Sequence, residues 1–475
     1  MRHLSAQLCL AALLLASGRL AVAGEGRLFS DFSCANVSPA RVDRPDLWRQ
    51  LGLGMARCEA TWPAVQPRPD EWQWADVDVR LLELANAGIP ALLLIGYTPP
   101  WAWVDEGYTF EEAGHRWEVT LGAFDPSKGH RPAHLRLTHL TDGKVTEGEP
   151  GNLPPKSVAD WERFVEHVVR RYSRPPFNVR YFQVWNEFNW PVPWYMQTWR
   201  DFIDRIHVPA ARIIRRHGGQ VVFGGWACTA GPDDLCNLLE YHDAWKHTDI
   251  IDFHYQVNAA FQVCYDRYVR GGKCRGIWQT EVGWTEWKEY LVNVYPRVFY
   301  WALKHGYDNP DKYKMFWFHY VGPSALALTD QFAPGQPLGE HGKCLRTLAN
   351  LLVGRVRAWD GYTTRPGLPF SLTEESPSSE GFATANGVVV AAHLPEAELA
   401  NTTPLGFGLP GLAPRVVEVR ACDRLGADLP VEVERRGRDL AVTVGLRAAS
   451  PETWRFEARG LTVFLRVILD AAPPA

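Results

Sequence analysis

Two glutamates stand at the ends of apolar segments with the character of strands, and their position predicts chemistry. Glu187 closes the run Tyr-Phe-Gln-Val-Trp-Asn-Glu, and Glu281 directly follows Gly-Ile-Trp-Gln-Thr. A carboxylate at the end of a buried strand is poorly solvated, so its presence there needs a reason. A pair of opposed carboxyls is what the cleavage of a glycosidic bond requires. The sequence therefore predicts that these two side chains face each other.

Short apolar runs alternate with longer amphipathic stretches from Leu28 to Leu352. The alternation predicts repeated βα units, and the eight strand-like runs predict an α/β fold of the (β/α)8 TIM barrel type. The candidate strands are Leu28 to Ala35, Gly54 to Thr61, Pro90 to Tyr97, Val179 to Trp185, Val221 to Trp226, Ile250 to Tyr255, Gly276 to Thr280 and Lys314 to Tyr320. Active sites of such barrels lie at the carboxyl ends of the strands, which is where Glu187 and Glu281 stand.

Helices are expected between these strands, wherever apolar residues recur at spacings of three and four. The clearest is Ser157 to Tyr172, in which Ser157 and Asp160 resemble an N-terminal capping box. The other candidates are Val77 to Ala87, Trp199 to His217, Asp233 to Trp245, Tyr290 to His305 and Gly342 to Leu352.

One connection is far longer than the others. The segment from Val104 to Lys156 follows the third strand and is polar and rich in Gly, His, Glu and Pro. Connections of this length are usually functional or disordered. Since this one leaves the carboxyl end of a strand, we expect it on the active face. Alternating runs at Trp117 to Leu121 and Leu135 to Leu140 predict a hairpin within it.

After Leu352 the pattern changes, which divides the chain into a barrel over residues 28–352 and a second domain over residues 353–475. Short alternating runs separated by Pro, Gly and Asn predict an all-β appendage, by default a sandwich. Its strand candidates are Gly387 to His393, Val416 to Ala421, Leu440 to Val444 and Leu461 to Leu469.

The first 23 residues read as a secretory signal peptide: two basic residues, an apolar run from Leu8 to Ala16 and the small-residue site Ala21-Val22-Ala23. We therefore expect a secreted or periplasmic protein, and an uncleaved anchor is the alternative. No later run is apolar enough to span a membrane. The formal net charge is −4 and becomes more negative when Arg2 and Arg19 are cleaved off, which argues against nucleic acid as a partner.

Eight cysteines follow the signal segment, and none has the spacing of a zinc site, so neither a metal nor another cofactor is expected. In an exported chain these cysteines can form disulfides. Cys228 with Cys236, and Cys264 with Cys274, are the nearest pairs in sequence, and free buried thiols are the alternative.

The residues described so far resemble glycoside hydrolases of clan A, most closely family 39 and next family 5. The matching pieces are Val-Trp-Asn-Glu (184 to 187), Gln-Thr-Glu-Val-Gly-Trp (279 to 284), the Gly54 to Pro67 run with Arg57, and Tyr-Thr-Pro-Pro-Trp (97 to 101). The resemblance covers about residues 28 to 352. It implies a retaining β-glycosidase or endoglycanase with Glu187 as acid/base, Glu281 as nucleophile and a carbohydrate substrate.

The family resemblance also implies substrate-binding residues. Asn186 would bond the sugar 2-hydroxyl, with a helix-capping role as the alternative. Arg57, at the end of the second strand, is placed to be the cation that keeps Glu281 ionised. Indoles stack on sugar rings, and the chain has 21 Trp. Trp101, Trp284 and Trp317 are therefore candidates, although core packing explains any one of them as well.

The sixth strand departs from the family 5 pattern, in which His-x-Tyr places both side chains in the pocket. Here His254 and Tyr255 are adjacent, and alternation sends them to opposite faces unless the strand ends between them. We favour His254 as the inward residue and leave Tyr255 open. Family 5 also has a histidine on the third strand, where this chain has Tyr97 and Thr98.

Two other functions fit the same residues. A transglycosylase would use the same intermediate on Glu281 and pass the glycosyl group to a sugar. A non-catalytic carbohydrate-binding barrel would need neither glutamate, so the presence of both disfavours it.

Overall fold

The computed structural model describes residues 26–37, 41–104, 106–112, 115–125, 131–132, 135–148, 153–189, 199–285, 287–322, 325–330, 335–395, 404–446 and 460–470. The expected signal peptide, residues 1–23, lies outside the described residues.

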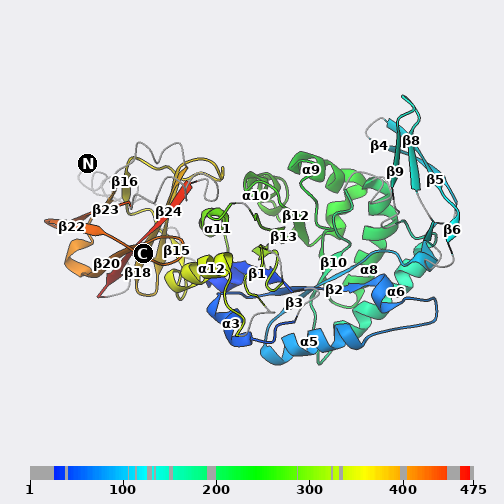
Figure 1. Ribbon diagram of the computed structural model, residues 1–475, viewed down its shortest axis with the longest axis horizontal. Coiled ribbons are helices and arrows are strands. Elements are labelled where there is room, and N and C mark those ends of the chain that lie inside the picture. The colour runs from blue at the N-terminus through cyan, green and yellow to red at the C-terminus, as the bar shows by residue number, and fades with distance from the viewer. Residues whose placement is uncertain are drawn as a thin grey trace, which may run out of the picture.

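Eight parallel strands close into a barrel in the order β1-β14-β13-β12-β11-β10-β3-β2 (Figure 1). All eight predicted strands are present, and the (β/α)8 fold is confirmed. The strands are β1 Ser33–Asn36, β2 Ala56–Thr61, β3 Ala91–Gly96, β10 Tyr181–Val184, β11 Gln220–Val222, β12 Ile250–His254, β13 Gly276–Val282 and β14 Tyr313–Trp317.

The first strand begins later than expected. Residues Phe29–Phe32 form a helical turn, α2, and only then does β1 start. Phe29 and Phe32 are both buried, and both rings pack against Phe299. Two apolar residues three apart can line one face of a helix, so the apolar run from Leu28 was not a strand throughout.

The helices surround the barrel largely where the sequence predicts them. The described helices include α3 Pro45–Gln50, α5 Ala75–Ala87, α6 Val158–Tyr172, α8 Val208–Arg216, α9 Pro232–Glu240, α10 Ala259–Cys264, α11 Tyr290–Lys304 and α12 Glu340–Leu351. Ser157 caps α6, because its hydroxyl accepts a hydrogen bond from the Asp160 N–H at 3.3 Å. The sequence prediction missed α3 and α10.

The interior of the barrel is layered by strand alternation. Its lower layer is an apolar cluster of Cys34, Met55, Leu92, Tyr181, Val222, Ile250, Trp278 and Phe316. Side chains two residues further along a strand point to the same face, about 6.6 Å nearer the carboxyl end. On five of the strands these next positions are polar: Asn36, Arg57, Gln183, Asp252 and Thr280. The upper interior is therefore a polar layer beneath the mouth.

The long insertion folds as a small antiparallel sheet of order β4-β5-β8-β9, which stands at the end of the molecule farthest from the C-terminal domain (Figure 1). Its strands are β4 Tyr108–Glu112, β5 His115–Leu121, β8 Leu135–His139 and β9 Val145–Gly148. The predicted hairpin runs are confirmed as the neighbouring strands β5 and β8. The two outer strands were not predicted.

The C-terminal part folds as two antiparallel sheets that share one apolar core, so the β-sandwich is confirmed. Their short strands are β15 Arg357–Ala358, β16 Thr363–Arg365, β19 Leu405–Leu409 and β21 Asp428–Leu429. One sheet has the order β15-β17-β18-β24-β20-β21 and the other β16-β19-β23-β22. Their longest strands are β17 Ser378–Thr384, β18 Gly387–Pro395, β20 Val416–Cys422, β22 Val431–Arg436, β23 Asp439–Val444 and β24 Gly460–Leu469.

The sandwich packs directly on the barrel helix α11. Phe382 of β17 stacks on Phe299 with ring centroids 6.0 Å apart, and both belong to the large apolar cluster of the barrel. The buried Arg297 of α11 donates hydrogen bonds to the carbonyls of Ser371, Thr373 and Ser376. Polar and apolar contacts thus join the two domains.

The eight described cysteines are all unpaired, so neither expected local disulfide is present. Six of them are buried, which agrees with the alternative of free buried thiols. Cys236 instead contacts Cys264, which belongs to the next helix. Within the described residues, no helix has both the length and the apolar character needed to cross a bilayer.

Candidate active site

Strained backbone marks the mouth of the barrel. Tyr97, Trp185, Glu187 and Tyr255 all have positive φ, between 48° and 70°, and they follow β3, β10 and β12. Such conformations cost non-glycine residues about 1 to 3 kcal/mol each and gather at functional sites. The turn at Glu187 is held by its N–H, which lies 2.9 Å from the Gly224 carbonyl and 3.1 Å from that of Gly225. These contacts hold the backbone conformation from which the Glu187 side chain extends.

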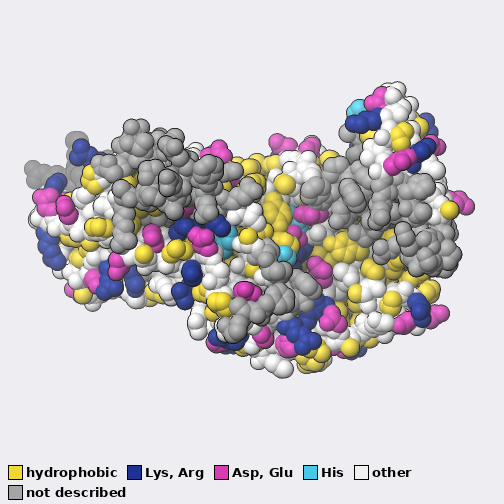
Figure 2. Space-filling model, in the orientation of Figure 1, with side chains coloured by type: hydrophobic (Ala, Val, Ile, Leu, Met, Phe, Trp, Pro, Cys, Tyr) yellow, Lys and Arg dark blue, Asp and Glu magenta, His cyan; other side chains and the backbone are white. Residues whose placement is uncertain are grey.

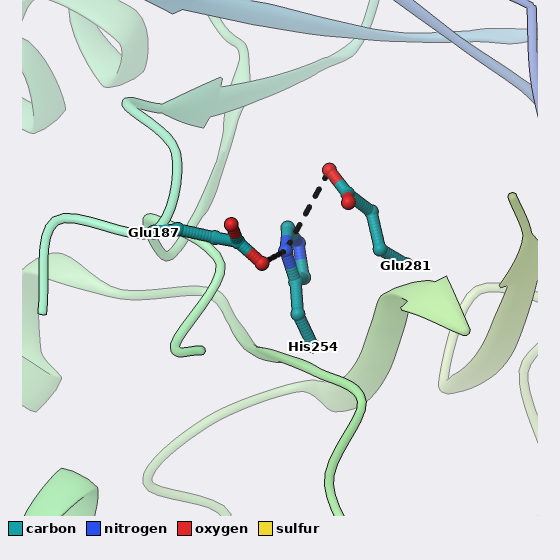
Figure 3. A group of neighbouring side chains, drawn as sticks. All are labelled: Glu187, His254 and Glu281. Carbon is teal, nitrogen blue, oxygen red and sulfur yellow. Dashed lines mark hydrogen bonds and ion pairs between the residues drawn. The ribbon is translucent and has the colours of Figure 1, made fainter. Parts of the chain in front are cut away.

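Glu187 and Glu281 point toward each other with His254 between them (Figure 3). His254 Nδ1 lies 2.9 Å from Glu187 Oε1 and 3.6 Å from Glu281 Oε1. One carboxylate oxygen of each glutamate and a ring nitrogen of His254 all lie within 4.8 Å of one another. The predicted opposition of the two carboxyls is therefore present in the structure. Acidic, histidine and hydrophobic side chains meet near the middle of the molecule (Figure 2).

Arg57 connects the two strand-end motifs. Its Nη1 donates to Glu281 Oε1 at 2.8 Å, and its Nη2 donates to Asn186 Oδ1 at 2.6 Å. Further bonds run to Gln183 Oε1 at 2.7 Å and Asn36 Oδ1 at 3.0 Å. Arg57 is only 2% exposed, and a buried charge needs such partners. The guanidinium is thus the cation beside Glu281, where the sequence predicts one.

His254 and Tyr255 both reach the site, because β12 ends between them. Tyr255 takes φ 50°, and its N–H donates to the Glu281 carbonyl at 3.0 Å. Its hydroxyl then lies 3.5 Å from Glu281 Oε2, at the limit of a hydrogen bond. Burial and the nearby Glu281 raise the pKa of Tyr255, so its hydroxyl keeps its proton and remains a donor. The sequence left open whether Tyr255 faces the site, and it does so because β12 ends at His254.

The three candidate tryptophans occupy three different environments. Trp284, three residues after Glu281, is 44% exposed. Trp101 is partly buried, packs edge-on against Trp62 and donates its ring N–H to the Gln66 carbonyl. Both indoles therefore keep part of their surface exposed.

Trp317 was given two alternatives, stacking on a sugar and core packing, and the structure shows core packing. It is fully buried, and its ring N–H donates to the Leu326 carbonyl at 2.7 Å. Its neighbour Phe316 belongs to the barrel interior, so alternation turns Trp317 outward toward the helices. Its indole cannot meet a substrate there. Phe318, the next residue on the inner face, has its ring centroid 6.4 Å from that of Tyr255.

Glu59 is a site residue that the sequence prediction missed. It lies two residues after Arg57 on β2 and therefore faces the same interior, closer to the mouth. Burial raises the pKa of Glu59, Arg57 lowers it and the Glu281 charge raises it further. The described residues give its carboxylate no hydrogen-bond partner. The two-residue spacing between Arg57 and Glu59 could have predicted from the sequence that both side chains face the barrel interior.

Glu187, His254 and Glu281 are also close enough to share one cation. Carboxylate and imidazole atoms are usual metal ligands. In this site, however, Arg57 lies 2.8 Å from Glu281 and already opposes its charge. A divalent ion would have to share that carboxylate with a guanidinium, so the negative charge that would attract the ion is already partly neutralised.

Solved structures with a similar fold are glycoside hydrolases. A family 39 glycoside hydrolase from the gut symbiont Bacteroides cellulosilyticus WH2 matches with a TM-score of 0.55 and 14% identity over 94% of this chain and 82% of that one. A GH30 endoxylanase from Clostridium papyrosolvens C71 matches with a TM-score of 0.55 and 9% identity over 94% and 98%. A glucosidase from Croceicoccus marinus matches with a TM-score of 0.52 and 12% identity over 93% and 98%.

No protein-family model and no curated protein sequence matches the chain. At these identities the structural similarity shows the fold alone. It agrees with the resemblance found in the Val-Trp-Asn-Glu (184 to 187) and Gln-Thr-Glu-Val-Gly-Trp (279 to 284) segments. The chain has the fold of glycoside hydrolases of families 39 and 30.

Proposed function

We propose that the protein is a retaining glycoside hydrolase that cleaves β-glycosidic bonds by double displacement. The observation that carries the proposal is the approach of the Glu187 and Glu281 oxygens to within 4.8 Å. Retaining enzymes hold their carboxyl groups about 5 to 5.5 Å apart, whereas inverting enzymes need about 6.5 to 9.5 Å to admit a water. This spacing supports direct attack on the sugar by one carboxylate.

The partners of the two glutamates support different roles for them. Glu281 receives a hydrogen bond from Arg57 and lies beside the Tyr255 hydroxyl, as suits an ionised nucleophile. Glu187 has His254 as its neighbour at 2.9 Å, a group that can hold or return a proton. We assign Glu281 as nucleophile and Glu187 as acid/base.

The reaction then follows in two steps. Glu281 Oε attacks the anomeric carbon while Glu187 gives its proton to the departing glycosidic oxygen, which leaves as an alcohol. Glu187, now ionised, takes a proton from water, and the resulting hydroxide releases the sugar from Glu281 with its configuration retained. Asn186 Oδ1 is held by Arg57, so its amide N–H groups are left to bond the sugar 2-hydroxyl.

A carbohydrate is the proposed substrate, and the site favours a neutral one. Glu59, Glu187 and Glu281 converge there, and Arg57 is already bonded to Glu281 and Asn186. Two structural neighbours are named as an endoxylanase and a glucosidase, so xylosides and glucosides are the first substrates to test. We further propose that the insertion from Val104 to Lys156 shapes binding of long substrates, and that the protein is exported after removal of residues 1–23.

The test is a screen of aryl β-glycosides and polysaccharides with the wild type and Glu281→Gln. The product anomer is followed by proton NMR during the first minutes. Hydrolysis with initial β product, absent in Glu281→Gln, supports the proposal, and initial α product excludes a retaining mechanism. Transfer to an added sugar acceptor in preference to water would identify the transglycosylase instead. Binding of polysaccharide without any turnover would identify a carbohydrate-binding barrel.

A further inference from the structure

We propose that Asp252 and Thr280 are positioning residues that act through His254 to hold Glu187 and its proton in place for the reaction. The inference rests on the proposed function, in which Glu187 is the acid/base. It concerns residues inside the barrel that no substrate can touch.

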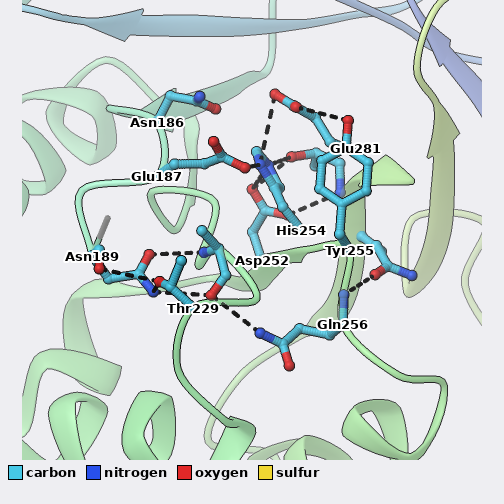
Figure 4. Close-up of polar contacts among 12 residues, drawn as sticks. Asn186, Glu187, Asn189, Thr229, Asp252, His254, Tyr255, Gln256 and Glu281 are labelled. Carbon is cyan, nitrogen blue, oxygen red and sulfur yellow. Dashed lines mark hydrogen bonds and ion pairs between the residues drawn. The ribbon is translucent and has the colours of Figure 1, made fainter. Parts of the chain in front are cut away.

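A continuous hydrogen-bonded chain leads from Asp252 to Glu187 (Figure 4). The Thr280 hydroxyl lies 2.8 Å from Asp252 Oδ2, and the Thr280 N–H donates to Asp252 Oδ1 at 3.0 Å. His254 Nε2 lies 2.7 Å from the same hydroxyl, and His254 Nδ1 lies 2.9 Å from Glu187 Oε1. Three different strand ends, those of β12, β13 and β10, are thereby linked.

The direction of the chain follows from the proton that each group can give. Above its pKa of about 7, Asp252 is ionised and only accepts hydrogen bonds, so the Thr280 hydroxyl must donate to it. That hydroxyl has a single proton, and its oxygen must then accept from His254 Nε2–H. The other ring nitrogen, Nδ1, is left to share one proton with Glu187. Asp252 thus sets the tautomer of His254 in which Nδ1 can take a proton from Glu187 and give it back.

The charges around the ring favour this arrangement. Burial on its own would lower the pKa of His254, but Glu281, Glu187 and Asp252 together raise it. Burial raises the pKa of Asp252 to about 7, against the opposing effects of His254, Thr280 and Arg57. The charged groups around the ring are therefore Glu187 after β10, Glu281 on β13, Asp252 on β12 and Arg57 on β2. The raised pKa of His254 favours an imidazole that holds a proton beside Glu187.

The ring is also held in place sterically. Gly225 lies against it with φ 60°, and a Cβ at this position would come within 2.5 Å of His254 Cε1 and Nε2. His254, Asp252 and Thr280 are each 0% exposed. Because Asp252 cannot meet the substrate, any effect of Asp252 on the reaction must pass through Thr280 and His254.

The test uses three variants: Asp252→Asn, Thr280→Val and Thr280→Ser. The amide introduced by Asp252→Asn would donate to the Thr280 hydroxyl, which would then donate to His254 Nε2 and place the ring proton on Nδ1 permanently. Asp252→Asn and Thr280→Val should lower kcat/KM about 10- to 100-fold for glycosides with poor leaving groups. They should change it less than about 3-fold for dinitrophenyl glycosides, which need no proton from Glu187. In Asp252→Asn the basic limb of the pH profile should also move to lower pH, since the Glu187 and His254 pair loses the Asp252 charge.

Thr280→Ser restores the hydroxyl and should recover most of the activity. Equal losses on good and poor leaving groups, or a Thr280→Ser enzyme no better than Thr280→Val, would overturn the inference, because a purely structural tie between β12 and β13 predicts that result. If Asp252→Asn does not fold, as judged by circular dichroism, the two Thr280 variants still decide. A wild type that hydrolyses no glycoside would refute the proposed function itself, which is a different outcome.

Discussion

Arg57 and Glu281 form the central ion pair of the barrel, with Arg57 Nη1 2.8 Å from Glu281 Oε1 and both side chains almost completely buried. The same guanidinium holds Asn186 at 2.6 Å, so a single residue of β2 sets the position of groups on β10 and β13. Arg57 is the residue through which the two strand-end motifs are coupled.

Arg57→Lys should therefore damage catalysis severely. An ammonium is a point charge and cannot reach Glu281, Asn186 and Gln183 together, as the planar guanidinium does. We expect kcat/KM to fall at least about 100-fold, since hydrogen bonds to charged groups contribute about 1.5 to 3 kcal/mol each. Arg41→Lys is the matched control, because Arg41 is 51% exposed and pairs with Glu83 on the surface. Near-normal kinetics in Arg57→Lys would contradict the coupling role.

Glu187→Ala should separate the two chemical steps. Cleavage of natural sugars should be crippled, because their leaving groups depart as poor alkoxides without a proton. Dinitrophenyl glycosides should still form the glycosyl-enzyme, and their hydrolysis should show a burst as the second step becomes limiting. The basic limb of the pH profile should disappear. A uniform loss across all leaving groups in stopped-flow assays would mean that Glu187 is not the acid/base.

Glu59 should make the enzyme discriminate against acidic sugars. A substrate carboxylate about 6 Å from Glu59 would meet a repulsion of about 2 to 3 kcal/mol at an effective dielectric constant of about 20, or about 100-fold in kcat/KM. Glu59→Gln should reduce the preference for a neutral glycoside over the matching glycuronide about 10-fold or more. An unchanged ratio of the two kcat/KM values would show that Glu59 does not face the bound sugar.

Trp317→Ala and Trp284→Ala should affect different properties. Trp317 is fully buried, and removing its ring should lower the free energy of unfolding by about 3 to 5 kcal/mol. Trp284 is 44% exposed, so its replacement should change stability by less than about 0.5 kcal/mol and instead raise KM. Urea unfolding and steady-state kinetics of both variants provide the comparison. A raised KM with normal stability in Trp317→Ala would reverse the assignment.

The fold and the opposition of the two glutamates could be predicted because both depend on local patterns. Eight apolar runs of strand length, separated by longer amphipathic stretches, define the barrel, and an acid at the end of such a run is unusual enough to be noticed. Arg57 could be placed by the same reasoning, since it stands at the end of the second strand.

The remaining features depend on pairing and alternation across strands, which a single sequence does not fix. Whether Trp317 or Phe318 faces inward depends on the register of β14, and Tyr255 reaches Glu281 only because β12 ends after His254. Asp252 reads as one polar residue within an apolar strand, and its partner Thr280 lies on the neighbouring strand. The cysteine contact between Cys236 and Cys264 likewise depends on how two helices pack.

The central claim is that Glu281 becomes covalently attached to the sugar. A 2-deoxy-2-fluoro glycoside with a dinitrophenyl leaving group slows both steps but the second more, so a glycosyl-enzyme should accumulate on the wild type. We predict that mass spectrometry of the intact protein will show one added fluoroglycosyl group, and that peptide mapping will locate it on Glu281. Inactivation without any adduct, or an adduct on another residue while Glu281 stays unmodified, would contradict the mechanism.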